Sequence, residues 1–156
     1  MPMLQLKEGM KAPVFEGTDQ DGNTIKLADF AGKKVVLFFY PKDNTANCTE
    51  EACNLRDNWD LFLIKGFVVI GISPDNEKSH KGYIKKYNLP FPLIADTSKT
   101  ILSDYGVWGE KKMYGRTFLG VIRTTFIIDE KGVIVKIINK VDTGEHSKQI
   151  FDLYIQ

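Results

Sequence analysis

The residue best suited to chemistry is Cys48, which follows a polar turn over residues 41–47. An apolar stretch, residues 35–40, precedes this turn, and a helical pattern begins around the cysteine. A helix N-terminus carries unpaired N–H groups and the positive end of the helix dipole, and both favour a thiolate over a thiol. The order of strand, turn and cysteine therefore predicts a reactive thiol.

The second cysteine, Cys53, lies five residues after Cys48 on the same predicted helix. Five helical residues give a rise of about 7.5 Å and a rotation of about 140°, which places the Cα atoms about 8.6 Å apart. A disulfide needs a Cα separation below ~7 Å. Either the two cysteines never pair, or the first turns of the helix unwind to let them.

A reactive thiolate at this position also needs a cation. An ordinary thiol is only a few per cent ionised at neutral pH, and a helix terminus adds at most ~2 kcal/mol of stabilisation to the anion. Arg123 is the candidate, because it opens an apolar strand-like stretch over residues 123–128 and would need an anionic partner if buried. The alternative is that Arg123 marks a solvent-facing strand end.

Three neighbours of Cys48 each have a chemical and a structural interpretation. The hydroxyl of Thr45 could donate to the thiolate and accept from a hydroperoxide, or it could simply cap the turn. Pro41 ends the strand and could also shield the site from water. Glu51 is expected to be a solvent-facing charge or, alternatively, a partner of Arg123.

The remaining chain offers little else for catalysis. The two histidines, His80 and His146, lie in polar surroundings and are expected on the surface rather than as ligands or bases. Without Cys-x-x-Cys or paired histidines we expect no structural zinc, and without a glycine-rich phosphate loop no nucleotide, so no cofactor is predicted. Four aromatic residues are expected in the core: Phe38, Phe39, Trp59 and Trp108.

Length and charge restrict the class of protein. The 156 residues suit one domain, residues 1–156, and the net charge of +1 without a basic stripe argues against nucleic-acid binding. Residues 1–8 do not resemble a secretion signal, and no apolar run reaches the ~18 residues of a membrane span. With only two cysteines a secreted disulfide framework is not expected, so we predict a cytoplasmic protein without membrane contact.

The hydrophobic pattern predicts an α/β fold. Strands are expected at residues 14–16, 24–26, 34–40, 67–73, 91–95, 123–128 and 133–138, with helices at 47–64, 76–88, 98–105 and 145–154 and a short helical turn at 27–32. Asn47 is expected to cap the first long helix together with Glu50. Residues 109–120 are expected to form an exposed loop. The order predicts a thioredoxin-like arrangement, with a mixed central sheet flanked by helices and an N-terminal β-hairpin.

These residues together resemble the peroxiredoxin family. Pro41-x-x-x-Thr45-x-x-Cys48 matches its active-site motif, and Arg123 at the head of Thr-Thr-Phe-Ile-Ile-Asp matches its active-site arginine. Cys53 resembles the resolving cysteine of the PrxQ, or bacterioferritin comigratory protein, subgroup. The likeness runs from about residue 9 to the C-terminus. One departure is that Ala-Asn precedes the cysteine here, where the subgroup usually has Pro-Gly.

The resemblance implies a thiol-dependent peroxidase for hydrogen peroxide and organic hydroperoxides. Cys48 would become a sulfenic acid while Thr45 and Arg123 hold the peroxide oxygens, and Cys53 would then form an intramolecular disulfide with it. Thioredoxin or a similar dithiol would reduce that disulfide. No cofactor is implied, and a monomer is expected because the resolving cysteine is on the same chain.

Two other functions remain open from the sequence. A thiol–disulfide oxidoreductase of the same fold would normally show Cys-x-x-Cys, and a proline at the place of Arg123. A redox sensor or holdase could use the same cysteine switch without rapid turnover.

Overall fold

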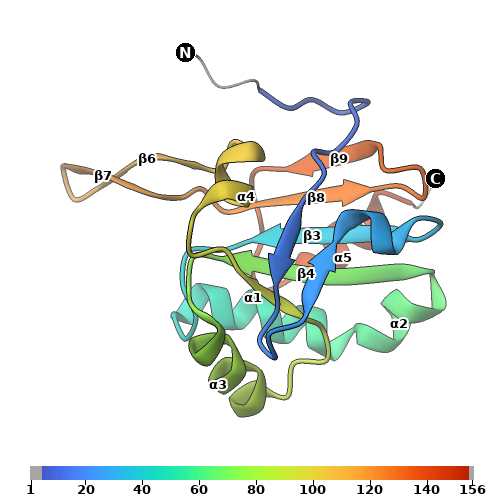
Figure 1. Ribbon diagram of the computed structural model, residues 1–156, viewed down its shortest axis with the longest axis horizontal. Coiled ribbons are helices and arrows are strands. Elements are labelled where there is room, and N and C mark those ends of the chain that lie inside the picture. Colours follow the sequence, from blue (N-terminus) through green and yellow to red (C-terminus); the bar gives the residue numbers. More distant parts are fainter. Residues whose placement is uncertain (1–4, 155–156) are drawn as a thin grey trace.

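The computed structural model describes residues 5–154 and has a five-stranded mixed sheet at its centre (Figure 1). The strands in spatial order are β5 (Leu93–Ala95), β4 (Phe67–Ser73), β3 (Lys34–Phe39), β8 (Thr124–Ile128) and β9 (Ile134–Ile138). The first three run parallel, whereas β8 and β9 are antiparallel to their neighbours. The predicted mixed sheet is confirmed.

Alternate residues of β3 build two separate cores, one on each face of the sheet. Val35, Leu37 and Phe39 belong to one hydrophobic cluster, while Val36 and Phe38 belong to the other. Since successive side chains of a strand point to opposite faces, a strand covered on both sides reads as a continuous apolar run. This is why the sequence pattern located the central strands well.

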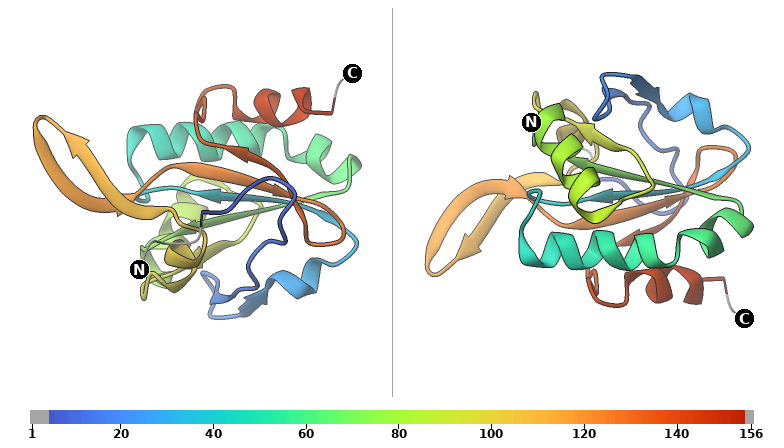
Figure 2. Two further views of the ribbon diagram at one scale, coloured as in Figure 1. Left: turned by 90° about the horizontal axis from the view of Figure 1, so that it is seen from above. Right: turned by 90° about the horizontal axis from the view of Figure 1, so that it is seen from below.

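Helices and a small hairpin cover the two faces (Figure 2). On one face lie α1 (Ala46–Asp57), α2 (Trp59–Ile64) and α5 (His146–Asp152). The other face carries the hairpin of β1 (Glu16–Thr18) and β2 (Thr24–Lys26), the short helix η1 (Leu27–Phe30) and α4 (Thr100–Asp104). Helix α3 (Glu77–Tyr87) packs beside β5 at the edge of the sheet. The predicted N-terminal hairpin is present, and no helix within residues 5–154 has the length and apolar character needed to cross a membrane.

The register of β3 and β8 determines where the site forms. Phe39, the last residue of β3, pairs with Thr124, the first residue of the antiparallel β8. The loop that leads from β3 into α1 and the segment that leads into β8 therefore meet at one end of the sheet. This juxtaposition brings Cys48 and Arg123 together although they are far apart in the sequence.

The predicted helix over residues 47–64 is wrong in two details. It begins at Ala46 with Thr45 as N-cap, so Asn47 is already inside the first turn, and it is interrupted at Asn58 between α1 and α2. The Asn58 side chain donates to the Asn54 carbonyl at 2.9 Å, which gives this backbone acceptor a partner where the regular helix stops. The expected capping pair of Asn47 and Glu50 is not formed.

The prediction of a loop over residues 109–120 is also wrong. These residues form a hairpin of β6 (Trp108–Met113) and β7 (Arg116–Val121), which projects from the body of the molecule (Figures 1 and 2). Its two-residue turn has positive φ at both Tyr114 (54°) and Gly115 (76°), as a type I′ turn requires. The lysines and glycines of these two strands interrupt the alternation of apolar and polar residues that predicts a β-hairpin.

Candidate active site

Cys48 is the third residue of α1 and is only 1 % exposed to solvent. The first bond of the helix ladder runs from the Thr49 N–H to the Thr45 carbonyl at 2.9 Å, so the Cys48 N–H belongs to the first turn, which lacks intrahelical acceptors. The sulfur thus lies at the positive end of the helix dipole, where an anion is stabilised. The strand β3 and the loop after it hold this helix end against the sheet.

Arg123 lies between β7 and β8 and joins two acids. One terminal nitrogen donates to Cys48 Sγ at 3.1 Å, and the other donates to Glu51 Oε1 at 2.5 Å. The arginine side chain is 19 % exposed, so these contacts are largely shielded from water. Burial by itself disfavours the guanidinium charge, but the Glu51 carboxylate and the Cys48 sulfur outweigh it, and the pKa of Arg123 is raised. Of the two interpretations of Arg123, the structure has the buried one with an acidic partner.

Glu51 is a fully buried acid, one helical turn after Cys48. Burial raises its pKa to about 7, although Arg123 pulls the value down. Its Oε1 is held by Arg123, whereas Oε2 has no hydrogen-bond partner among residues 5–154. His146 Nε2 lies 3.5 Å from Oε2.

His146, the first residue of α5, is fully buried, so its predicted surface position is wrong. Its Nε2 lies 2.8 Å from Thr125 Oγ1 on β8, and its Nδ1 lies 2.8 Å from Gln149 Oε1. Burial lowers its pKa to about 4, with the Gln149 contact opposing this shift and Arg123 adding to it. The polar neighbours of His146 in the sequence gave no sign of this burial, which it shares with Ser147 and Ile150 of α5.

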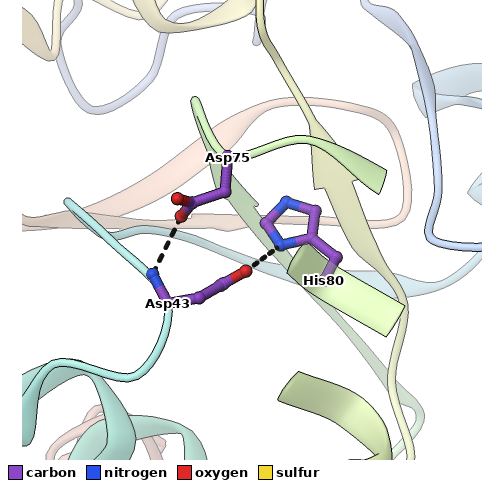
Figure 3. Close-up of side chains that lie close together, drawn as sticks. All are labelled: Asp43, Asp75 and His80. Carbon is purple, nitrogen blue, oxygen red and sulfur yellow. Dashed lines mark hydrogen bonds and ion pairs between the residues drawn. The ribbon is translucent and has the colours of Figure 1, made fainter. Parts of the chain in front are cut away.

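The predicted surface position of His80 is also wrong, because this residue of α3 is fully buried. Its Nδ1 contacts Asp43 Oδ2 at 2.7 Å, and its Nε2 contacts the Ile94 carbonyl oxygen at 3.0 Å (Figure 3). Asp43 lies in the loop between β3 and α1, five residues before Cys48. The histidine therefore ties the loop of the site to α3 and β5.

Asp75 completes a cluster with Asp43 and His80, whose potential ligand atoms lie within 4.8 Å of one another (Figure 3). Asp75 Oδ2 accepts from the Asp43 N–H at 2.8 Å and from the Ser73 hydroxyl at 2.7 Å. Asp43 Oδ1 accepts from the Tyr40 hydroxyl at 2.7 Å. Since hydrogen bonds occupy both Asp43 oxygens and both His80 nitrogens, the geometry is that of a hydrogen-bonded support for the loop.

Thr45 and Pro41 border the site from the same loop. The Thr45 hydroxyl donates to the Lys42 carbonyl at 2.8 Å, so its hydrogen is directed away from Cys48, and the side chain is exposed. Pro41 directly follows the buried Tyr40 at the end of β3 and is itself half-buried. Both residues thus stand near the helix start, with the threonine lone pairs still able to accept a hydrogen bond.

A family profile described as the AhpC/TSA family matches residues 9–137. The chain belongs to this family. It is 44% identical over 147 residues to a putative peroxiredoxin bcp of Coxiella burnetii, covering 94% of this chain and 97% of the relative. It is 41% identical over 143 residues to peroxiredoxin Bcp of Bacillus subtilis, covering 92% and 91%.

Solved structures agree with this placement in the AhpC/TSA family. Peroxiredoxin Q of Xanthomonas campestris superposes with a TM-score of 0.84 at 31% identity, over 89% of this chain and 88% of that one. A cysteine-to-serine mutant of PrxQ from Xylella fastidiosa gives a TM-score of 0.90 at 26% identity, over 97% and 96%. The predicted peroxiredoxin family, thioredoxin-like fold and thiol peroxidase activity are confirmed.

Cys53 lies half-buried on α1, and both cysteines of this AhpC/TSA chain are free thiols on one intact helix. Burial raises the pKa of the Cys53 thiol, with Arg56 opposing and Asp57 reinforcing the shift. This thiol is therefore less inclined to ionise than an ordinary one, which suits a second-acting rather than a first-acting cysteine.

Asn54, the next residue, anchors α1 to the start of α5. Its amide donates to the Gly144 carbonyl at 2.9 Å and accepts from the Ser147 N–H at 2.7 Å. The Ser147 hydroxyl also donates to the Asn54 carbonyl at 3.1 Å. This anchor is not predictable from the local sequence, because it depends on contacts across 90 and 93 positions of the chain.

Proposed function

We propose that Cys48 is the residue that reduces the peroxide and that Cys53 resolves the oxidised product. The observation that carries this assignment is the contact of Arg123 with Cys48 Sγ at 3.1 Å, at a buried helix N-terminus. A cation and a helix dipole on one sulfur favour the nucleophilic thiolate. Cys53 lacks a comparable hydrogen-bonded cation among residues 5–154 and is therefore assigned the second step.

In the first step the Cys48 thiolate attacks the terminal oxygen of the hydroperoxide. The S–O bond forms as the O–O bond breaks, sulfur is oxidised to a sulfenic acid, and the leaving alkoxide or hydroxide takes up a proton. Arg123 is positioned to stabilise the charge that moves from sulfur to the leaving oxygen. The Thr45 hydroxyl donates to Lys42, so its proposed part is to accept the hydroperoxide O–H through its lone pairs.

The proposed substrates are hydrogen peroxide and organic hydroperoxides. The name of one Xanthomonas campestris structure, similar to this chain with a TM-score of 0.84 and 30% identity, refers to the alkyl peroxide reduction activity of bacterioferritin comigratory protein. The same class of substrate is proposed here, because the Cys48 sulfur can attack a peroxide oxygen while Arg123 and the Thr45 hydroxyl can hydrogen-bond to it.

In the second step Cys53 attacks the sulfenic sulfur, water leaves, and a Cys48–Cys53 disulfide forms. Both residues lie on the intact α1, and five helical residues separate Cα atoms by about 8.6 Å, so the first turns must open. Thioredoxin or a similar dithiol then reduces the disulfide. We propose that the protein acts as a monomer, since both cysteines of the cycle are on one chain, and that it acts in the cytoplasm, since two cysteines do not suit a secreted disulfide framework.

The test is peroxide consumption coupled to thioredoxin and thioredoxin reductase, followed by the intact mass of the oxidised protein. Cys48→Ser should abolish consumption; undiminished activity in this variant would refute the assignment. Cys53→Ser should still add one oxygen to Cys48 but should not lose the two hydrogens that mark an intramolecular disulfide. An unchanged disulfide in Cys53→Ser would refute the pairing.

A further inference from the structure

The single positive charge of Arg123 is shared between two acidic groups. Its terminal nitrogens donate separately to Cys48 Sγ and to Glu51 Oε1, and both acids are almost completely buried. If both were ionised, the cluster would carry an excess negative charge away from water, which is costly. Ionisation of Cys48 and ionisation of Glu51 therefore oppose each other.

The histidine behind Glu51 adds to this opposition. Gln149 donates its amide N–H to the Lys140 carbonyl at 3.0 Å and accepts the Asp142 N–H at Oε1, so its oxygen is the atom that faces His146. His146 Nδ1 must then carry a hydrogen. In the neutral ring Nε2 presents a lone pair, which takes the Thr125 hydroxyl and lies 3.5 Å from Glu51 Oε2. A proton on Glu51 Oε2 removes the repulsion between these two atoms.

Within residues 5–154, the other charged groups near the site do not supply Glu51 Oε2 with a hydrogen bond in place of this proton. Lys111 of β6 reaches the region, but its pKa is lowered first by burial and then by Arg123, and its ammonium donates to the Val121 carbonyl at 2.8 Å. Asp142 lies on the His146 side, where it favours the imidazolium. Glu50, the neighbour on α1, accepts from the Thr143 hydroxyl at 2.7 Å. Within residues 5–154, Glu51 Oε2 keeps no hydrogen-bond donor.

We propose that Glu51 holds a proton while Cys48 is a thiolate, and that it gives up this proton when the thiolate is oxidised and the leaving oxygen takes one up. This inference rests on the proposed function of Cys48. While the sulfur is anionic, Arg123 is neutralised by it and Glu51 stays protonated; once the sulfur is a neutral sulfenic acid, Arg123 is free to stabilise the Glu51 carboxylate. The pKa of Glu51, raised to about 7 by burial against the pull of Arg123, places this exchange close to neutrality.

The step balances without any further reactant. The thiolate of Cys48, the hydroperoxide and the carboxylic acid of Glu51 give the sulfenic acid, an alcohol or water, and the Glu51 carboxylate. Sulfur is oxidised by two electrons, the O–O bond is reduced, and the proton lost by Glu51 equals the one gained by the leaving oxygen. Without the proton held by Glu51, the oxidation of each thiolate would withdraw one proton from the solvent.

Proton uptake during a single oxidation tests the proposal directly. Cys53→Ser, which stops after the first step, is mixed with hydrogen peroxide in weak buffer containing an indicator dye, at about pH 6.5 where Glu51 is mostly protonated. The thiolate absorbance measured at the same pH gives the fraction of Cys48 that is ionised beforehand, and the proton uptake is expressed per ionised thiolate. We expect uptake of less than about half a proton per ionised thiolate, rising to about one proton in Cys53→Ser/Glu51→Gln.

A matched control is Cys53→Ser/Glu50→Gln, which removes the neighbouring exposed acid and should behave as Cys53→Ser does. Equal uptake with and without Glu51, at any level, would overturn the proposal. If the Gln variant does not fold, the pH series of Cys53→Ser suffices: uptake should rise to about one proton by about pH 8.5, and a constant value would overturn the proposal. Absence of any sulfenic acid in the mass spectrum would instead refute the proposed function itself.

Discussion

Two buried histidine–carboxylate pairs adjoin the candidate site around Cys48, and they are built differently. The pair of His80 and Asp43 holds the loop before α1, with 2.7 Å between Nδ1 and Oδ2. The pair of His146 and Glu51 stands behind Arg123, with 3.5 Å between Nε2 and Oε2. Both histidines and Glu51 are completely buried, and Asp43 nearly so, so burial alone does not distinguish the pairs.

The two pairs differ in how many of their polar atoms have hydrogen-bond partners. In the first pair both nitrogens of His80 and both carboxylate oxygens of Asp43 have hydrogen-bond partners. In the second pair Glu51 Oε2 has no hydrogen-bond partner within residues 5–154. A fully bonded network fixes one geometry, whereas an incompletely bonded one leaves the position of a proton open.

The largest expected effect is on stability, in the first pair. His80→Leu removes the 2.7 Å contact with the buried Asp43 carboxyl group, so the free energy of unfolding should fall by about 3–5 kcal/mol. Urea unfolding of the reduced protein measures this loss. Lys81→Leu, an exposed change on the same helix, should stay within about 0.5 kcal/mol. A loss below about 1 kcal/mol in His80→Leu would remove the distinction between the pairs.

The second effect is on the rate of reaction with peroxide, and it concerns Arg123, the partner of Glu51 in the second pair. Arg123→Met removes the cation shared by Cys48 and Glu51, so the second-order rate constant with peroxide should fall by about 10²–10³-fold. Stopped-flow kinetics measure it, with Arg116→Met on the projecting hairpin as a cationic control that should keep the parent rate. Stability should change less than in His80→Leu, because Glu51 can be neutralised by a proton. A rate within about threefold of the parent would contradict the role given to Arg123.

The third effect is the pH dependence that Glu51 contributes to stability. Its pKa is raised from 4.5 to about 7 on folding, so the folded state binds more protons in this interval and the contribution is lost as the pH rises through it. The stability of the parent relative to Glu51→Gln should therefore decrease by about 3 kcal/mol between about pH 4.5 and pH 7. The lowered pKa of His146, about 4, acts in the opposite direction in both proteins and cancels in the difference. A difference independent of pH would show that Glu51 does not titrate in this interval.

The smallest expected effect is that of His146→Leu. This change removes hydrogen bonds to Thr125 and Gln149 but no short ionic contact, so the free energy of unfolding should fall by about 1–3 kcal/mol. The same urea unfolding series compares it with His80→Leu. Should the two losses prove equal, the pairs would be energetically alike in spite of their different bonding.

Much of the site could be predicted because its signals are local. The apolar run into β3, the turn after it and the helix start place Cys48 from a stretch of fewer than twenty residues. Arg123 could be predicted because a cation among apolar strand residues needs a partner. The contact of Arg123 with Glu51 was one of two alternatives, and only the register of β3 against β8 distinguishes them.

The buried histidines could not be predicted from their own neighbourhoods. His80 depends on Asp43, 37 positions away, and His146 on Thr125, 21 positions away. Each lies in a run of polar residues, which predicts an exposed segment. The hydrophobic pattern of a helix reflects the helix as a whole and does not identify a single inward-facing polar residue. A signal did exist for His80, because it lies three residues before the buried Tyr83 on the same face of α3.

Asn54 anchors α1 just beyond the turns whose opening the proposed disulfide requires. Its side chain joins the helix to residues 144 and 147 immediately after Cys53. Only the turns ahead of that anchor need to lose their hydrogen bonds, so the opening is a local unfolding event and not a global one. A sulfenic acid that waits for a slow opening reacts with a second peroxide and becomes a sulfinic acid. In the proposed cycle, an anchor that limits how much helix has to melt would favour disulfide formation over this inactivation.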